Sequence, residues 1–137
     1  MGKYCHDDAH DALLNYIVNN CDRMYLCTIN TESGGIPDHT MVLAANLITD
    51  PLDGDGDGVL MSSGDFTLAD GDVSGRKITV SEQANKDVDT SGDAVHIALT
   101  DDGNTKVLYQ TVCTTQSLSS GSQVTIPAWD IENRDPV

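Results

Sequence analysis

FTLADGDVSGRKITV (residues 66–80), AVHIALTDDGNTKVLYQTVCTTQ (94–116) and LSSGSQVTIPAWDIENRDPV (118–137) decide the fold of this chain. Each stretch places short runs rich in β-branched residues around a turn that contains Asp, Gly or Asn. The clearest hairpin joins residues 94–100 to residues 105–113 through a turn at residues 101–104, with Val95, Ile97 and Leu99 on one face and His96 and Ala98 on the other. These patterns predict a mainly β fold, a small antiparallel β-sandwich or partial barrel.

The rest of the chain adds a helix and further short strands to this body. Residues 6–20 are predicted to form an α-helix whose buried face carries the apolar positions at helical spacing. That face contains Ala9, Ala12, Leu13, Tyr16 and Ile17. Strands are expected at residues 23–29, 66–68, 77–80 and 124–126. Residues 40–48 permit either helix or strand, and a short helix or an irregular buried segment is favoured. We therefore expect one domain over residues 1–137, with a helix at 6–20, a β-rich body at 23–130 and a polar tail at 131–137.

The charge of the chain limits its partners. The formal net charge is -15, and Asp outnumbers Glu by 19 to 3. Asp favours turns and caps over helix interiors, which agrees with many short strands. So acidic a chain is unsuited to nucleic acid or to anionic membrane surfaces, which attract Lys and Arg.

The four cysteines are Cys5, Cys21, Cys27 and Cys113, without a Cys-x-x-Cys pair. The N-terminus is acidic and has no sustained apolar core, and no run approaches the roughly 18 apolar residues of a membrane helix. We expect synthesis in the cytoplasm and free, mostly buried thiols.

The turn at residues 53–58 (DGDGDG) opens like a calcium-binding loop, with Asp53, Asp55 and Asp57 as candidate ligands. An EF-hand would need Glu at loop position twelve, where this chain has Gly64. A looser Ca²⁺ site and an acidic, glycine-rich surface turn remain as alternatives, and the second is favoured.

Cys5, His6 and His10 suggest zinc, because the two histidines are four residues apart on one helix. No third ligand follows, and exposed histidines at a helix start are the favoured interpretation. His39 and His96 are isolated, and the chain has no G-x-S-x-G, P-loop or G-x-G-x-x-G motif. We therefore predict no catalytic residues and no cofactor. The single Trp, Trp129, is expected to close the core or to form a subunit contact.

The segments SGDFTLADGDVSGRKITVSEQ (63–83), HIALTDDGNTKVLYQT (96–111) and QSLSSGSQVTIPAWDIENRDPV (116–137) resemble a family of small virion structural proteins of tailed bacteriophages. The resemblance covers about residues 64–137. It implies a non-enzymatic β-domain of the virion, made in the host cytoplasm. It supplies no catalytic residues.

The leading hypothesis is a head decoration or cement protein that binds the major capsid protein or other virion proteins. The alternative within the virion is a tail, neck or baseplate component. We also expect a homo-oligomer, for example a trimer, with residues 1–5 or 131–137 as arms that add a strand to a neighbour. An alternative of another class is a calcium-dependent ligand-binding β-domain, and a metalloenzyme at Cys5, His6 and His10 is the weakest hypothesis.

Overall fold

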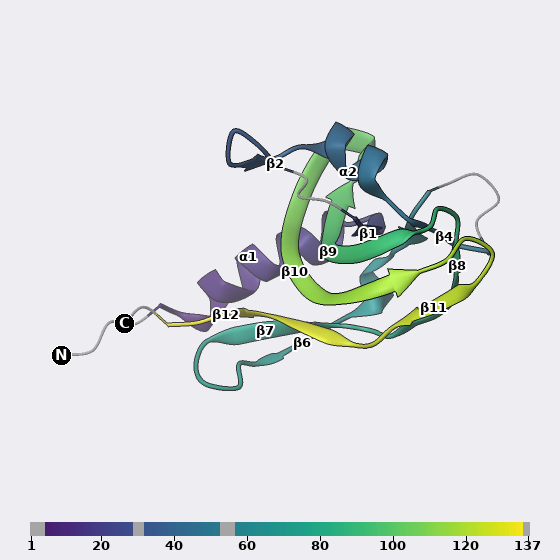
Figure 1. The fold of residues 1–137 in the computed structure, drawn as a ribbon. Helices are drawn as coiled ribbons and strands as arrows, with labels where there is room; N and C mark the ends of the chain where they lie inside the picture. The colour runs from purple at the N-terminus through teal and green to yellow at the C-terminus, as the bar shows by residue number, and fades with distance from the viewer. Residues whose placement is uncertain (1–4, 29–31, 53–56, 136–137) are drawn as a thin grey trace.

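The computed structural model describes residues 5–28, 32–52 and 57–135. These residues form one four-stranded sheet, two three-stranded sheets and a short two-stranded hairpin, with a long helix at the N-terminus (Figure 1). In chain order the elements are α1 (Asp7–Asn20), β1 (Arg23–Cys27), β2 (Glu32–Ser33), β3 (Ile36–Pro37), α2 (His39–Ala45), β4 (Ile48–Thr49), β5 (Val59–Leu60), η1 (Ser63–Asp65), β6 (Phe66–Asp70), β7 (Arg76–Val80), β8 (Gln83–Val88), β9 (Gly92–Asp101), η2 (Asp102–Asn104), β10 (Lys106–Leu118), β11 (Gln123–Ile126) and β12 (Trp129–Asn133). The predicted fold class, mainly β with an N-terminal helix, is confirmed.

The four-stranded sheet has the order β10-β9-β1-β5 and is antiparallel throughout. The β9–β10 hairpin predicted from the sequence is present; β9 is longer than expected at both of its ends, whereas β10 begins one residue later and ends five residues later than expected. Alternation along β9 separates its two faces: Ile97 and Leu99 join the main core, whereas Ala98 packs in a second cluster with Val42 of α2. This sheet is therefore covered on both sides.

The two three-stranded sheets, β12-β7-β6 and β11-β8-β4, are joined by two short connections. Only residues 81–82 separate β7 from β8, and only residues 127–128 separate β11 from β12. The two sheets thus form a long bent ribbon, seen in the lower part of Figure 1. The main core lies between this ribbon and the four-stranded sheet, where Met24 and Leu99 meet Ile78, Val80 and related side chains.

The predicted polar tail at residues 131–137 is wrong over its first part. β12 continues to Asn133, and Ile131 is buried opposite Ile78 of β7. The error arose because a single apolar residue between Asp130 and Glu132 was too weak a pattern to predict a strand. Residues 131–133 therefore belong to β12 and are not a free arm, while the other expected arm, residues 1–5, lies outside the described residues except for Cys5.

Helix α1 exists as predicted, but it is rotated relative to the predicted buried face. The buried side chains are His10 and Leu14, which are 2% and 3% exposed. Leu13 and Tyr16, expected in the core, are 64% and 50% exposed. α1 packs against β6 and β7, and its apolar outer face points away from them.

Most of the ambiguous segment at residues 40–48 is helical. The Asp38 side chain accepts a hydrogen bond from the Met41 backbone N–H at 3.1 Å and so caps α2. Val42 and Ala45 are the buried residues of α2, which packs on β1. The segment then leaves the helix and forms β4.

Strand β8 was not predicted, because its sequence QANKDV does not alternate in polarity. Asn85 has a left-handed backbone (φ 55°), and the β8–β11 register shifts beside it. Such a bulge breaks the two-residue period on which strand prediction depends.

The turn between β6 and β7 yields a stability prediction at Gly75, which has φ +70°. A Cβ there would overlap the carbonyl of Asn133 at the end of β12. Gly75→Ala should therefore lower the free energy of unfolding by about 2–4 kcal/mol, from strain and overpacking together. Gly121→Ala is the matched control, because Gly121 has φ +89° with open space around it, so only about 1 kcal/mol should be lost. Urea denaturation would measure both, and equal losses would contradict the packing argument.

Candidate functional site

The candidate zinc ligands have separate structural roles. The Nδ1 atom of His6 accepts a hydrogen bond from the Asp8 backbone N–H at 3.1 Å, which caps α1. His10 is buried and its Nε2 lies 3.0 Å from Asp135 Oδ1, so it joins α1 to the chain after β12. The expectation that both histidines are exposed is therefore wrong for His10. Over residues 5–28, 32–52 and 57–135, no three His, Cys, Asp or Glu side chains are grouped to hold a metal ion.

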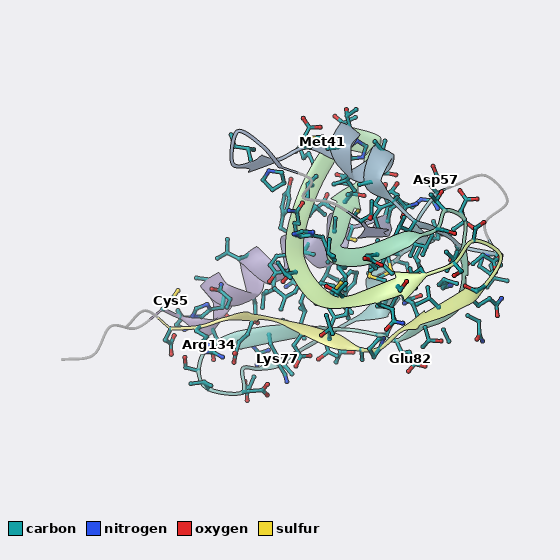
Figure 2. The ribbon with its side chains drawn as sticks, viewed as in Figure 1. Cys5, Met41, Asp57, Lys77, Glu82 and Arg134 are labelled. Atoms are coloured by element: carbon teal, nitrogen blue, oxygen red, sulfur yellow. The ribbon has the colours of Figure 1, made fainter. Side chains whose placement is uncertain are left out.

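The candidate calcium turn falls largely outside the described residues. Asp53 and Asp55 are not among them, and Asp57 is exposed at the edge of that gap. Figure 2 shows Asp57 and Cys5 at opposite ends of the molecule. The adjoining Gly58 donates its backbone N–H to Ile48 at 2.8 Å, which anchors the end of the turn on β4.

All four cysteines are free thiols, as expected, and Cys21 and Cys27 are buried. Burial raises the pKa of each of these two thiols to about 12. Burial also raises the pKa of the half-buried Cys113. Because the thiolate is the reactive form, these side chains are suited to packing and not to nucleophilic chemistry.

A polar cluster that was not predicted is centred on Asp102, in the turn between β9 and β10. Asp102 Oδ1 accepts hydrogen bonds from His39 Nε2 and from Thr100 Oγ1, each at 2.7 Å, and Oδ2 accepts from Tyr25 Oη at 2.5 Å. The backbone N–H of Asp102 also donates to Asp22 Oδ1 at 2.8 Å. The cluster therefore joins β1, α2 and the β9–β10 hairpin.

The electrostatics of this cluster favour an ionised carboxylate. Burial alone would raise the pKa of Asp102, but hydrogen bonds from Tyr25, His39 and Thr100 outweigh it and hold the pKa below its usual value. Burial and the hydrogen bond to Asp102 raise the pKa of Tyr25. Tyr25 therefore stays a neutral donor and Asp102 a charged acceptor.

The Asp102 cluster resembles an acid–base pair in composition but is arranged as a structural connection. Both oxygens of Asp102 are occupied by donors of the same chain, and Thr100 is fully buried. None of its residues lines the groove beside β10. No sequence signal could have identified it, because Tyr25, His39 and Asp102 are far apart in the chain.

That groove runs between β10 and the β11–β12 segment and has a volume of about 800 Å³. Ala94 and Ile97 of β9 contribute to it, and its other lining residues include Val112, Gln116 and Trp129. Trp129 stacks on Tyr109 with ring centroids 6.0 Å apart and packs against the main core. Trp129 thus packs as the core-closing role predicts, and a subunit contact at Trp129 stays a prediction.

Besides this groove, the surface carries an apolar stripe along the outer face of α1. It consists of Ala9, Ala12, Leu13 and Tyr16, spaced as neighbours on one helix face, and we call it the α1 stripe. Asp7 and Asp8 are exposed at its N-terminal end. An apolar stripe that the chain leaves uncovered is typical of a surface that contacts another protein.

Most described basic side chains are engaged within the chain. Arg76 pairs with Asp11 and Asp70, and Lys77 pairs with Asp72 and Asp130. Buried Lys86 pairs with buried Asp50, and Arg134 with Glu132. The surplus acidic charge is therefore not balanced by cations displayed for a partner. In the part of the chain that the structure describes, no helix is both long and apolar enough to span a membrane.

Comparison of the chain with protein-family models, with curated proteins and with solved structures finds no match.

Proposed function

We propose that the chain is a non-enzymatic structural protein of tailed-bacteriophage particles, acting as a head decoration or cement protein on the major capsid lattice. It would be made in the host cytoplasm and reside in the virion. The resemblance of residues 64–137 to small virion proteins supports this role. A place in the tail, neck or baseplate is the alternative within the same class.

The observation that carries the proposal is the α1 stripe. Leu13 and Tyr16 expose half or more of their surface, although their spacing is that of a buried helix face. Burying such residues in a contact contributes roughly 25 cal/mol per Å² of apolar area. Many copies on a closed lattice would each need only a modest contact of this kind.

The charge distribution defines the partner surface. Asp7 and Asp8 lie at the end of the α1 stripe, and neither forms an ion pair with a Lys or Arg among the described residues. A complementary surface would therefore have an apolar centre and a rim of Lys or Arg beside these carboxylates.

The first experiment is to determine the copy number and location of the chain in purified particles, by mass spectrometry and labelling. Hundreds of copies on the head would support decoration. A few copies at one vertex or along the tail would support the alternative, and absence from particles would contradict the virion role.

A variant of Leu13 then tests the α1 stripe. Leu13→Glu should weaken binding to purified capsids at least about tenfold, because it places a charge at the centre of the contact. Leu60→Glu is the matched control, since Leu60 is 54% exposed on β5, compared with 64% for Leu13. Cosedimentation with capsids would measure both, and an equal effect of the two variants would exclude the α1 stripe as the contact.

A further inference from the structure

The groove beside β10 lies in a part of this acidic chain that carries no charge. Residues 107–129 contain no Asp, Glu, Lys or Arg, although such residues make up 21% of the chain. They form most of β10, all of β11 and the start of β12. The described side chains that line the groove are all uncharged, including those from β1 and β9. Depletion of charge is typical of the centre of a protein–protein interface.

The groove is bordered by the edges of two strands rather than by their faces. Residues 122–127, which include β11, all line it, and so do residues 111–114 of β10. Successive side chains of a strand point to opposite faces, so an unbroken run of lining residues indicates that each strand meets the groove along its edge. β8 occupies the other edge of β11, and β9 the other edge of β10. Figure 1 shows β10 in yellow-green and β11 in yellow on the same side of the molecule.

The outer edge of β11 can accept a further strand. In the described parts of the chain, β8 is the only strand paired with β11. Edge strands are normally protected from pairing by charged residues, and β11 has none. Ile126 is buried in the main core and Val124 packs against it, whereas Thr125 is exposed. A strand laid beside β11 would follow the same alternation, with every second side chain over the core and the others in solvent.

The core side of the groove is apolar. Leu26, Ile97, Leu118 and Ile126 line the groove and are buried members of the main core. Apolar side chains of an added strand would therefore meet apolar side chains, and their burial contributes roughly 25 cal/mol per Å². Main-chain hydrogen bonds to the edge of β11 would supply the rest of the affinity.

The charge of the chain indicates what flanks such a strand. A second copy would bring the same net charge of -15 and would be repelled. A different protein, with Lys or Arg on either side of an uncharged stretch, would be attracted to the acidic chain and would place no charge inside the groove. The described ion pairs engage most of the chain's own cations, so little would oppose a basic partner.

We propose that the groove binds an extended segment of another protein, which pairs with the outer edge of β11 as an added strand. The segment has at least four uncharged residues, the length of β11, with apolar side chains at alternate positions and Lys or Arg at its ends. No residue of the α1 stripe lines the groove, so this site is distinct from the proposed capsid contact and does not depend on it.

The probe is the synthetic peptide acetyl-Lys-Val-Thr-Val-Thr-Val-Lys-amide, and the readout is the fluorescence of Trp129. This residue is the single Trp of the chain and lines the groove. The peptide should shift its emission with a dissociation constant below about 1 mM. A matched peptide with Pro-Pro at its third and fourth positions keeps both lysines but lacks two backbone donors, so it should bind at least about tenfold more weakly. No shift at up to about 5 mM of the first peptide, or equal binding of both, would overturn the proposal.

Two threonine variants show whether the peptide lies in the groove. Thr114 and Thr115 are adjacent, exposed residues of β10, but of the two only Thr114 lines the groove. Thr114→Lys should weaken binding of the peptide at least about tenfold, because it places a long cationic side chain beside the lysines of the peptide. Thr115→Lys changes the net charge equally and should leave binding within about twofold. Thermal unfolding checks that both variants fold alike, and equal effects on binding would exclude the groove.

Hydrogen exchange locates the added strand. The peptide should slow amide exchange in β11 more than in β6, which is an edge strand of the other three-stranded sheet. Slower exchange in β6 and not in β11 would overturn pairing at β11. Sedimentation equilibrium of the chain alone distinguishes the remaining occupant: self-association that Thr114→Lys abolishes would assign the groove to a second copy and overturn the proposed partner.

Discussion

Lys86→Met should lower the free energy of unfolding by about 3–5 kcal/mol, the loss expected when one partner of a buried ion pair is removed. Lys86 Nζ lies 3.1 Å from Asp50 Oδ2, and both residues are less than 10% exposed. Methionine keeps a flexible apolar chain of similar length, so the loss should come from the uncompensated carboxylate rather than from a cavity. Urea denaturation at neutral pH measures it.

The pH dependence identifies the cause of this loss. Burial raises the pKa of Asp50, but hydrogen bonds from Leu52 and Lys86 outweigh it and leave the pKa below its ordinary value of 3.8. A carboxyl with a lowered folded pKa stabilises the protein above its unfolded pKa, and this contribution is lost as the pH falls through the folded value. In Lys86→Met, burial dominates the pKa of Asp50 because the bond from Lys86 is gone. The difference in unfolding free energy between wild type and variant should therefore shrink below about pH 4.

Two further variants serve as controls. Lys77→Met removes a lysine that pairs with the exposed Asp72, so its effect should be much smaller than that of Lys86→Met. Asp50→Asn combined with Lys86→Met should recover part of the stability, because no charge is then left buried. Equal losses from Lys77→Met and Lys86→Met would contradict a special role for the buried pair.

The sequence predicted those elements whose apolar pattern agrees with their burial. The β9–β10 hairpin was predictable because Ile97 and Leu99 alternate with Ala98 between two covered faces. The orientation of α1 was not, because its apolar residues are divided between the core and the α1 stripe, and the polar His10 takes a buried position. Periodicity identifies an amphipathic helix but not which face the chain itself will cover.

The polar contacts were beyond prediction for a different reason. Asp50 and Lys86, and Tyr25 and Asp102, are separated by long stretches of chain, and nothing local marks them as partners. The candidate metal ligands were chosen by their spacing along the chain. The structure uses His6 as a helix cap and His10 as a partner of Asp135, so spacing alone was a poor guide to their role.

Asp102→Ala should lower the free energy of unfolding by about 3 kcal/mol, because it leaves several buried donors without their acceptor. Tyr25 and Thr100 are 1% and 0% exposed, so water cannot replace the carboxylate without rearrangement. Tyr25→Phe removes one donor and leaves Asp102 its other partners, so its loss should be smaller, about 1–2 kcal/mol. Asp93→Ala, at an exposed position of the same strand β9, should change stability by no more than about 0.5 kcal/mol.

Acidification should reduce the difference in unfolding free energy between wild type and Asp102→Ala. The folded pKa of Asp102 lies below its ordinary value of 3.8, so its contribution is complete at neutral pH and is lost as the pH falls through the folded pKa. Urea denaturation at about pH 7 and about pH 3 should therefore give stabilities that converge at the lower pH. Hydrogen exchange supplies the local readout: loss of the His39 contact should speed exchange in α2 more than in β6 and β7. Parallel pH profiles, or exchange that rises equally in all elements, would show that Asp102 does not hold α2 to the hairpin through its charge.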